Sequence, residues 1–484
     1  MRSLQKKIML MVLMLSAFFC LFNETLLSVG DNVVMQEWKL AYTTVEWTMT
    51  IFLVAMSISV PLAAFVIRRW STKLILMIAL GLISLGLLID ACSPNFAVLL
   101  IGRTVEGLGA GFITPLLFTS VMKLVSPQKR GIATALCGIT CGLGPSFAPT
   151  YSGWILNNHF NWHTIFVAPL VICLLLCLIT PLTVYDISPH IKFVLDPLSI
   201  VESITGFPFL IVGIDLIATS LISVIGWVCA GIGLIICSFW AYRQYSISQN
   251  YSDQKTSGNT HTVPVLPLIH LPALINKIVG PAMLIIMCLQ VANMDLSVVY
   301  PMAVQPAFRL NSLQASLMLM VPLLISQFCA IFSGRLFDRF KSLWIIFSGF
   351  LLLIIGFLLF AINRHINSAG LTIVICAALC TFIGVSLITP AVEAITFSAV
   401  SERFIADVST GIQTMMQIGG AIGTAVTMSI FQISLASEPT QKDYLVAFGN
   451  ISWVMIILYI GCLFMIWKVW KSTSFTAKHL IVKE

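Results

Sequence analysis

Arg103 and Glu106 lie in the middle of a long apolar stretch that runs from Phe96 to Val125. If this stretch crosses a membrane, each charge costs about 2.5–3.5 kcal/mol at the bilayer centre, so it should face a partner or a water-filled cavity. Residues at i and i+3 are neighbours on a helix, so Glu106 could pair with Arg103. A membrane helix with such charges is seldom only an anchor, and a purely structural buried ion pair is the alternative.

Other apolar stretches each carry a single carboxylate, namely Glu24, Asp295, Glu393 and, beside Trp47, Glu46. A carboxyl group removed from water favours its neutral form, which allows it to bind and release protons near neutral pH. We predict Glu24 as the main proton-binding residue, with Asp295 and Glu393 as further candidates. For Asp295, Glu393 and Glu46, an interfacial or structurally satisfied carboxylate is an equal alternative.

The composition is that of a polytopic membrane protein. The chain has 484 residues, of which 58% are hydrophobic and only 9% charged, whereas soluble domains are about 25% charged. The 13 cysteines are scattered through apolar segments without paired spacing, so we interpret them as buried hydrophobic residues and predict no disulfide framework and no metal site. No Gly-Lys dipeptide occurs, so the chain has no Walker A loop and no sign of ATP use.

Hydropathy predicts fourteen transmembrane helices, the first of them over residues 8–29. This first apolar run lacks a small-residue cleavage site, so we interpret it as a helix and not as a signal peptide. Lys and Arg are concentrated in the loops on one side, which predicts that both termini are cytoplasmic. The net charge of +7 therefore reflects topology and not binding to nucleic acid.

An internal repeat divides the chain. The loop AFVIRRWSTK, which starts at Ala64, has a counterpart in GRLFDRFKSL, which starts at Gly334. Glu24 and Asp295 are separated by nearly the same sequence offset. Two related six-helix bundles are therefore expected, an arrangement typical of secondary transporters. The predicted units are residues 1–190 and 278–470 as bundles, 191–243 as two inserted helices, 244–277 as a cytoplasmic linker and 471–484 as a cytoplasmic tail.

Three motifs resemble those of a known family. The repeated loop is similar to the pattern G-x-L-x-D-R-x-G-R-K: the second copy supplies Gly334, Asp338 and Arg339, whereas the first keeps Arg69 but has Arg68 in place of Asp. The fourth span is similar to R-x-x-Q-G-x-G-A/G, with Glu106 in place of Gln. The fifth span is similar to the Gly- and Pro-rich antiporter motif through Gly138, Gly142, Gly144, Pro145, Pro149 and Gly153.

Through these motifs the chain resembles the major facilitator superfamily, specifically the 14-helix drug:proton antiporters of EmrB/QacA type. The FNETLL run and the SGWI ending of the fifth span look most like lincomycin-resistance-type exporters. The resemblance implies an all-α fold of two six-helix bundles plus two extra helices. It also implies that Gly334, Asp338, Arg339 and Arg69 latch one conformation, that Arg103 takes part in proton coupling, and that the bent fifth span belongs to an exporter. A packing-driven bend is the alternative for that span.

The expected function is proton-coupled multidrug efflux by alternating access, with Glu24, Glu46, Trp47 and Glu106 lining the substrate cavity. The expected partners are small amphipathic or lipophilic drugs, protons and the lipid bilayer of a bacterial cell membrane. The proton motive force would supply the energy, with no cofactor, no metal and no nucleic acid. Export of an endogenous metabolite, lipid or siderophore is the main alternative, and a membrane-embedded enzyme or a channel is a weaker one.

Overall fold

A computed structural model of the chain describes residues 2–28, 30–40, 42–158, 160–187, 196–219, 223–256, 265–310, 312–340, 344–363, 368–435 and 440–472. Fourteen helical segments in these ranges are long and apolar enough to cross a membrane. The prediction of fourteen spans is therefore confirmed. Most of the predicted tail, residues 471–484, and residues 257–264 of the predicted linker lie outside the described ranges.

The first six spans form one bundle in which neighbouring helices approach closely. Because lipid offers no hydrogen bonds, a chain that crosses it satisfies its backbone within helices. Asn95 and Ser71 accept hydrogen bonds from Val98 N and Leu74 N and so cap two of these helices, α6 and α5. The elements are α1 (Arg2–Glu24), α2 (Asp31–Glu37), α3 (Tyr42–Val45), α4 (Trp47–Arg69), α5 (Thr72–Ala91), α6 (Phe96–Leu124), η1 (Pro127–Lys129), α7 (Arg130–Asn157), η2 (Trp162–Phe166) and α8 (Val167–Thr183).

The last six spans form the second bundle. Its first span is interrupted by a short π-helix, η3, between two α-helical parts. The elements are α12 (Val279–Met294), η3 (Asp295–Val299), α13 (Tyr300–Phe308), α14 (Ser312–Phe340), α15 (Trp344–Ile362), α16 (Ser368–Ser398), η4 (Glu402–Phe404), α17 (Ile405–Ser434) and α18 (Gln441–Ser472).

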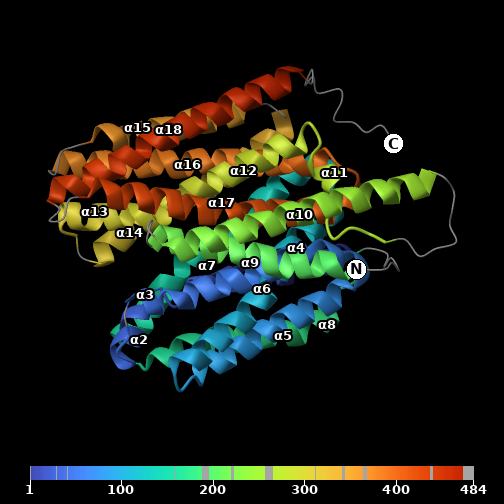
Figure 1. The fold of residues 1–484 in the computed structure, drawn as a ribbon, viewed down its shortest axis with the longest axis horizontal. Helices are drawn as coiled ribbons and strands as arrows, with labels where there is room; N and C mark the ends of the chain where they lie inside the picture. Colours follow the sequence, from blue (N-terminus) through green and yellow to red (C-terminus); the bar gives the residue numbers. More distant parts are fainter. Residues whose placement is uncertain are drawn as a thin grey trace.

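Two further spans, α9 (Pro197–Thr219) and α10 (Val224–Thr256), pack against each other along the seam between the bundles (Figure 1). α9 contacts α4 of the first bundle and α17 of the second. Thr50 of α4 donates a hydrogen bond of 3.2 Å to Asp215 of α9. A short helix, α11 (Leu271–Leu274), precedes the second bundle.

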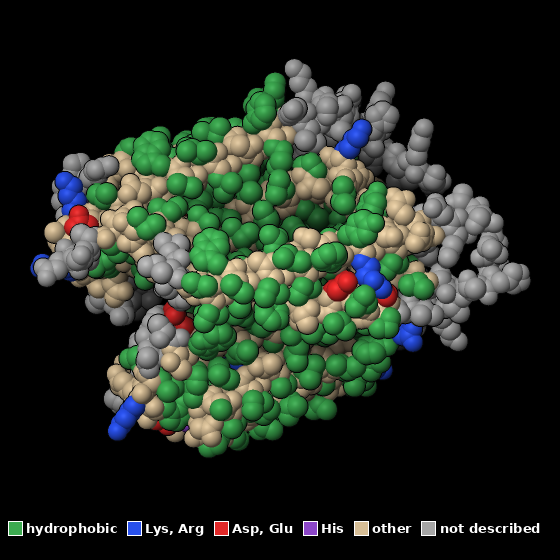
Figure 2. Space-filling view, viewed as in Figure 1, with side chains coloured by type: hydrophobic (Ala, Val, Ile, Leu, Met, Phe, Trp, Pro, Cys, Tyr) green, Lys and Arg blue, Asp and Glu red, His purple; other side chains and the backbone are tan. Residues whose placement is uncertain are grey.

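α1 begins and α18 ends at the same end of the molecule (Figure 1), which we call the termini end. The opposite end carries α2, α3 and α13. Hydrophobic side chains cover the middle of the face in Figure 2, whereas charged side chains gather toward the two ends. In the same view the opposite end is indented between the two bundles.

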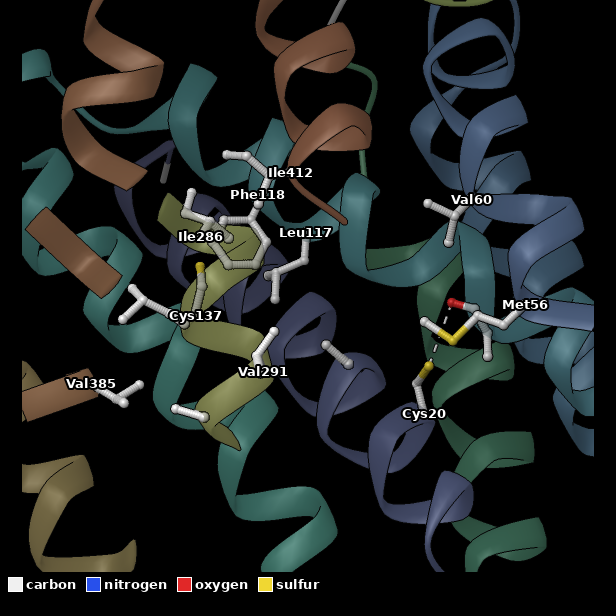
Figure 3. Close-up of a cluster of buried hydrophobic side chains, with 14 of the residues drawn as sticks. Cys20, Met56, Val60, Leu117, Phe118, Cys137, Ile286, Val291, Val385 and Ile412 are labelled. Carbon is white, nitrogen blue, oxygen red and sulfur yellow. Dashed lines mark hydrogen bonds between the residues drawn. The ribbon is translucent and has the colours of Figure 1, made fainter. Parts of the chain in front are cut away.

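A continuous hydrophobic core joins the two bundles. Figure 3 shows part of it, with Leu117, Phe118 and Cys137 of the first bundle facing Ile286 and Val291 of the second. Phe118 also stacks on Phe397 of α16, with ring centroids 6.2 Å apart. Apolar packing therefore holds the bundles together on this side of the seam.

The close approach of α7 to α1 gives a test of the packing. A Cβ atom added at Gly144 would lie 2.7 Å from Phe18 O and 2.8 Å from Phe22 N, whereas one added at Gly138 would meet nothing within 4 Å. Gly144→Ala should therefore force α1 and α7 apart and lower the free energy of unfolding by about 1–3 kcal/mol. Gly138→Ala is the matched control and should be neutral or stabilising, because Ala favours helix over Gly. Thermal unfolding in detergent measures both; equal midpoints for the two variants would contradict this packing.

Candidate functional site

Arg103 holds the end of α1 in the interior of the first bundle. α1 ends at Glu24, before the end of the predicted span of 8–29. The Arg103 guanidinium, 1% exposed, donates hydrogen bonds to the carbonyl oxygens of Asn23 (3.0 Å) and Glu24 (3.1 Å) at this end, and to that of Thr48 (3.3 Å) in α4. The last carbonyl groups of a helix lack intrahelical donors, so Arg103 allows α1 to stop inside the bundle.

Glu106 neutralises Arg103 from within the same helix. Arg103 Nη1 and Glu106 Oε2 are 2.5 Å apart, and both side chains are fully buried. This contact confirms the ion pair predicted from the i, i+3 spacing. The guanidinium also lies over the ring of Phe52, 4.6 Å from its centroid. Glu106 is thus packed inside the bundle, between Arg103 and α5.

Glu24 lies at the broken end of α1, next to an aromatic cluster. Phe18, Phe19 and Phe22 contact one another with ring centroids 5.0–5.8 Å apart, and Phe22 also contacts Tyr151 of α7 at 5.5 Å. Within the described part of the chain, the Glu24 carboxylate accepts no hydrogen bond, although its backbone carbonyl is held by Arg103. Its acidic side chain is therefore available for a proton or a ligand.

α7 supports the segment that follows Glu24. Pro149 has no N–H group to donate to the carbonyl oxygen of Pro145, and Thr25 donates to this oxygen instead, at 3.4 Å. Ser152 donates to Leu26 O at 2.5 Å. Gly142 and Gly144 of the antiporter motif lie against Gln327 of α14 and against α1, respectively. Gly138 has open space around it, and Gly153 is half-buried one turn beyond Pro149.

A pocket of about 290 Å³ opens beside α7, in the half of this helix that lies away from the termini end. Its lining residues are Phe147, Thr150, Tyr151 and Trp154. Tyr151 connects it through Phe22 to the end of α1. None of the residues predicted to line a cavity is among these four, and Glu24 is linked to the pocket through the contact of Phe22 with Tyr151. Glu46 and Trp47 are half-buried at the start of α4, and Glu106 lies in the packed interior.

The two carboxylates of the second bundle are buried in different places. Glu393 in α16 is 3% exposed, and both it and Glu24 lie within electrostatic range of the Cys141 thiol in α7. Asp295 is fully buried at the first residue of η3, and neither of its oxygens has a hydrogen-bond partner in the described chain. Glu24 and Glu393 thus lie near the same stretch of α7, whereas Asp295 faces Tyr459 of α18.

Two acidic residues near Arg103 were not predicted as site residues from the sequence. Asp90 in α5 is fully buried beside Glu106, and Asp31 in α2 accepts a hydrogen bond of 3.2 Å from Thr48. Burial raises the pKa of Asp31 to about 7, against the opposing effects of the Thr48 hydrogen bond and the positive charge of Arg103. The signal for Asp90 was its spacing from Gly86, which repeats the spacing of Glu106 from Gly102.

The second copy of the repeated loop joins the bundles at the termini end. Asp338 of α14 accepts hydrogen bonds from the backbone N–H groups of Gly131 (2.8 Å) and Ile132 (2.9 Å) at the start of α7. These amides have no partner within their own helix, and the helix N-terminus favours a negative charge. Gly334 and Gly131 pack backbone against backbone. Arg339 and, on the first copy, Arg69 are exposed on their helices.

The first copy joins the bundles with the opposite charge. Arg68 forms an ion pair of 2.6 Å with Asp407 in the first turn of α17. It also donates to the carbonyl oxygens of Pro267 (2.6 Å) and Leu268 (2.8 Å), and Asp407 accepts from His270 N at 2.7 Å. Sequence reasoning missed this contact because it noted only that an aspartate was absent from position 68.

The structure thus consists of two helical bundles, with Arg103, Glu106 and Asp90 buried inside the first and Arg68 paired with Asp407 between the two. The family model described as Major Facilitator Superfamily matches residues 13–424. The chain belongs to the Major Facilitator Superfamily, and it is therefore a transporter and not an enzyme.

Relatives and solved structures agree with this assignment. The chain is 27% identical over 456 residues to the lincomycin resistance protein LmrB of Bacillus subtilis (strain 168), covering 93% of this chain and 89% of that protein. It is 30% identical over 159 residues to a multidrug resistance protein B homolog of Mycobacterium tuberculosis (strain CDC 1551 / Oshkosh), covering 33% of this chain and 29% of that protein. The structure of the proton:xylose symporter XylE bound to 6-bromo-6-deoxy-D-glucose shares the fold, with a TM-score of 0.66 and 14% identity over 97% of this chain and 96% of that one.

The Arg68–Asp407 contact predicts energetic coupling across the seam. Arg68→Gln should destabilise the protein because it leaves the fully buried Asp407 without its counter-ion. Asp407→Asn should also destabilise it, and the double variant should lose less than the two single losses together, by about 0.5–3 kcal/mol. Thermal unfolding in detergent measures this cycle, with the exposed Arg335→Gln as a charge-matched control. Strict additivity would show that the two side chains do not interact.

The raised pKa of Asp31 predicts a pH-dependent stability. Its pKa is about 7 in the folded protein and about 4 in an unfolded chain, so the folded state binds more protons between these values. The contribution of Asp31 to stability should therefore fall as the pH rises from about 4 to about 7. The difference in unfolding temperature between wild type and Asp31→Asn should show this slope. A difference that does not change with pH would contradict the raised pKa.

Proposed function

We propose that the protein exports lipophilic drugs, cationic or neutral, across a bacterial cell membrane in exchange for protons. The observation that carries the proposal is the position of Glu24. Its carboxylate lies at a helix end inside the bundle, within electrostatic range of Arg103, and Phe22, two residues before it, contacts Tyr151 of the aromatic pocket. The names of the relatives, which refer to lincomycin and multidrug resistance, support a drug substrate.

The pocket on α7 suits a lipophilic substrate. Phe147, Tyr151 and Trp154 offer aromatic faces, and such faces attract organic cations as well as apolar groups. Glu24, reached through Phe22 and Tyr151, would supply a negative charge for a cationic substrate or accept a proton in its place. Competition between drug and proton for this carboxylate would give antiport.

Closed contacts at the termini end support an alternating-access cycle. Asp338 with α7, Arg68 with Asp407, and Ser409 with Pro115 O (3.0 Å) all join the two bundles there. The indentation in Figure 2 lies at the opposite end. If the termini end is cytoplasmic, as the distribution of Lys and Arg predicts, this conformation is closed to the cytoplasm. Drug entry would then require these contacts to open.

The proposed cycle uses the proton motive force and needs no ATP. Drug binds from the inner leaflet while Glu24 is ionised, and the bundles rock to expose the site to the outside. A proton from outside neutralises Glu24, the drug leaves, and the protonated carrier returns and releases the proton to the cytoplasm. For a neutral drug the exchange moves one net charge, and one charge that moves through 100 mV supplies about 2.3 kcal/mol, enough for a concentration ratio of roughly 50. Exchange of one proton for a monovalent cationic drug moves no net charge and uses the pH difference alone.

Proton release from inverted membrane vesicles tests this proposal. In vesicles with an imposed proton gradient, lincomycin or a lipophilic cation should cause proton release from wild-type protein and none from Glu24→Gln, which cannot ionise. Glu402→Gln removes the same charge from an exposed site and is the matched control. An equal response of wild type and Glu24→Gln would make Glu24 structural and direct attention to Asp295 and Glu393. If no drug causes a response in wild type, drug:proton antiport is contradicted.

A further inference from the structure

α5 and α6 cross so that each helix places a carboxyl group over a glycine of the other. A Cβ atom added at Gly102 would overlap the Asp90 carboxylate, and one added at Gly86 would overlap Cγ of Glu106. In both helices the glycine precedes the acidic residue by about one turn of helix. The two carboxyl groups therefore meet in the middle of the crossing, within hydrogen-bonding reach of each other.

This pair has too few hydrogen-bond donors for two ionised groups. Asp90 and Glu106 are both fully buried. Arg103 donates to one oxygen of Glu106. The other oxygen of Glu106 and both oxygens of Asp90 have no donor in the described part of the chain. An ionised carboxylate can only accept hydrogen bonds, so contact between two of them without a proton is repulsive.

The charges around the pair also indicate that Asp90 and Glu106 are not both ionised. Among the described residues, Arg103 is the one cation that interacts with either carboxyl group. The other ionisable groups that face this cluster are Glu24 and Cys20 of α1, Asp31 of α2 and Cys173 of α8. These groups supply no positive charge. A single guanidinium neutralises a single carboxylate, so a second carboxylate here would be an uncompensated buried charge.

We propose that Asp90 and Glu106 form a second proton-binding site, in which the two carboxyl groups share one proton. Glu106 is paired with Arg103 and remains the ionised partner, so the proton lies on Asp90 and points to the free oxygen of Glu106. The role of this site in transport rests on the function proposed above, whereas the shared proton itself does not.

Arg103 would couple this site to α1. The guanidinium holds Glu106 on one side and the carbonyl oxygens of Asn23 and Glu24 on the other. When the proton leaves Asp90, a second negative charge appears next to Arg103 and draws it away from these carbonyl oxygens. The end of α1 and the carboxylate of Glu24 then lose a support. Protonation of the pair would in this way control the position of the residue proposed to exchange protons with the drug.

Infrared spectroscopy of the purified full-length protein in lipid tests the shared proton directly. Wild type at neutral pH should absorb as a protonated carboxyl group buried from water. Protonated Asp295 or Glu393 would absorb in the same region, so wild type is compared with each variant by difference spectroscopy. The wild type minus Asp90→Asn spectrum should contain the band, because the group that carries the proton is gone. The wild type minus Glu106→Gln spectrum should contain it as well, because Asp90 then replaces Glu106 as the carboxylate on this side of Arg103 and ionises. Glu24→Gln should keep it. Absence of the band from both difference spectra would overturn the site.

Vesicle measurements test the coupling separately. Asp90→Asn keeps a hydrogen-bond donor toward Glu106 and should fold, yet it should release fewer protons per drug molecule than wild type. If the infrared band is assigned to Asp90 but Asp90→Asn releases as many protons as wild type, the proton is structural and the coupling is overturned. If wild type releases no protons with any drug while the band remains, drug:proton antiport fails and the shared proton stands.

Discussion

The bond between Arg103 and the end of α1 is the constraint on which the first bundle depends. A helix that stops inside a bilayer exposes carbonyl groups that neither lipid nor water can satisfy. Arg103 supplies the missing donors and also places a positive charge at the negative end of the helix dipole. The guanidinium is itself buried, so it requires Glu106, and Glu106 in turn requires a close crossing of α5 and α6 at two glycines. The position of Glu24 is thus the result of a chain of contacts through three helices.

The first span of the second bundle has a different backbone conformation at the equivalent position. At Asp295 the helix widens into a π-helical turn and then continues as α13. A π-helical turn keeps the backbone hydrogen-bonded, so no cation is needed to cap free carbonyl groups. The sequence agrees, because Ile373 stands in the second copy of the repeat where Arg103 stands in the first. Among the described residues, the first bundle alone therefore combines a broken helix, an arginine and a group of carboxylates, which explains why the proposed proton chemistry is concentrated there.

The sequence was sufficient for the number of spans and for the family. An apolar run long enough to cross a bilayer indicates a transmembrane helix. The Arg103–Glu106 pair depends only on the local geometry of one helix. The break at Glu24 was not visible, because the apolar run continues beyond it and the cause is a side chain from another helix. The position of Asp90 next to Glu106 depends on how α5 crosses α6, which the sequence does not show. The Arg68–Asp407 pair joins residues 339 positions apart, and nothing local in either segment marks its partner.

The two copies of the repeated loop show how one geometry is kept with opposite charges. Asp338, the repeat counterpart of Arg68, binds the N-terminus of α7 directly because free amides and the helix dipole both favour an anion. An arginine at the same place cannot bind such an end. Asp407 in the first turn of α17 reverses the local charge, and the carbonyl oxygens of Pro267 and Leu268 take the remaining donors of Arg68.

Because an arginine replaces the aspartate in the first copy, the linker and the two extra helices take part in the contact between the bundles. The backbone N–H of Leu268 donates a hydrogen bond of 2.7 Å to Gln244 Oε1 of α10, and Gln244 Nε2 donates to Ser199 Oγ of α9. Arg243 of α10 in turn forms an ion pair with Asp196 next to α9. The contact that joins the bundles at Arg68 therefore includes residues outside both bundles. Any motion that separates Arg68 from Asp407 must also release or carry the linker, so α9 and α10 bear on the opening of the termini end.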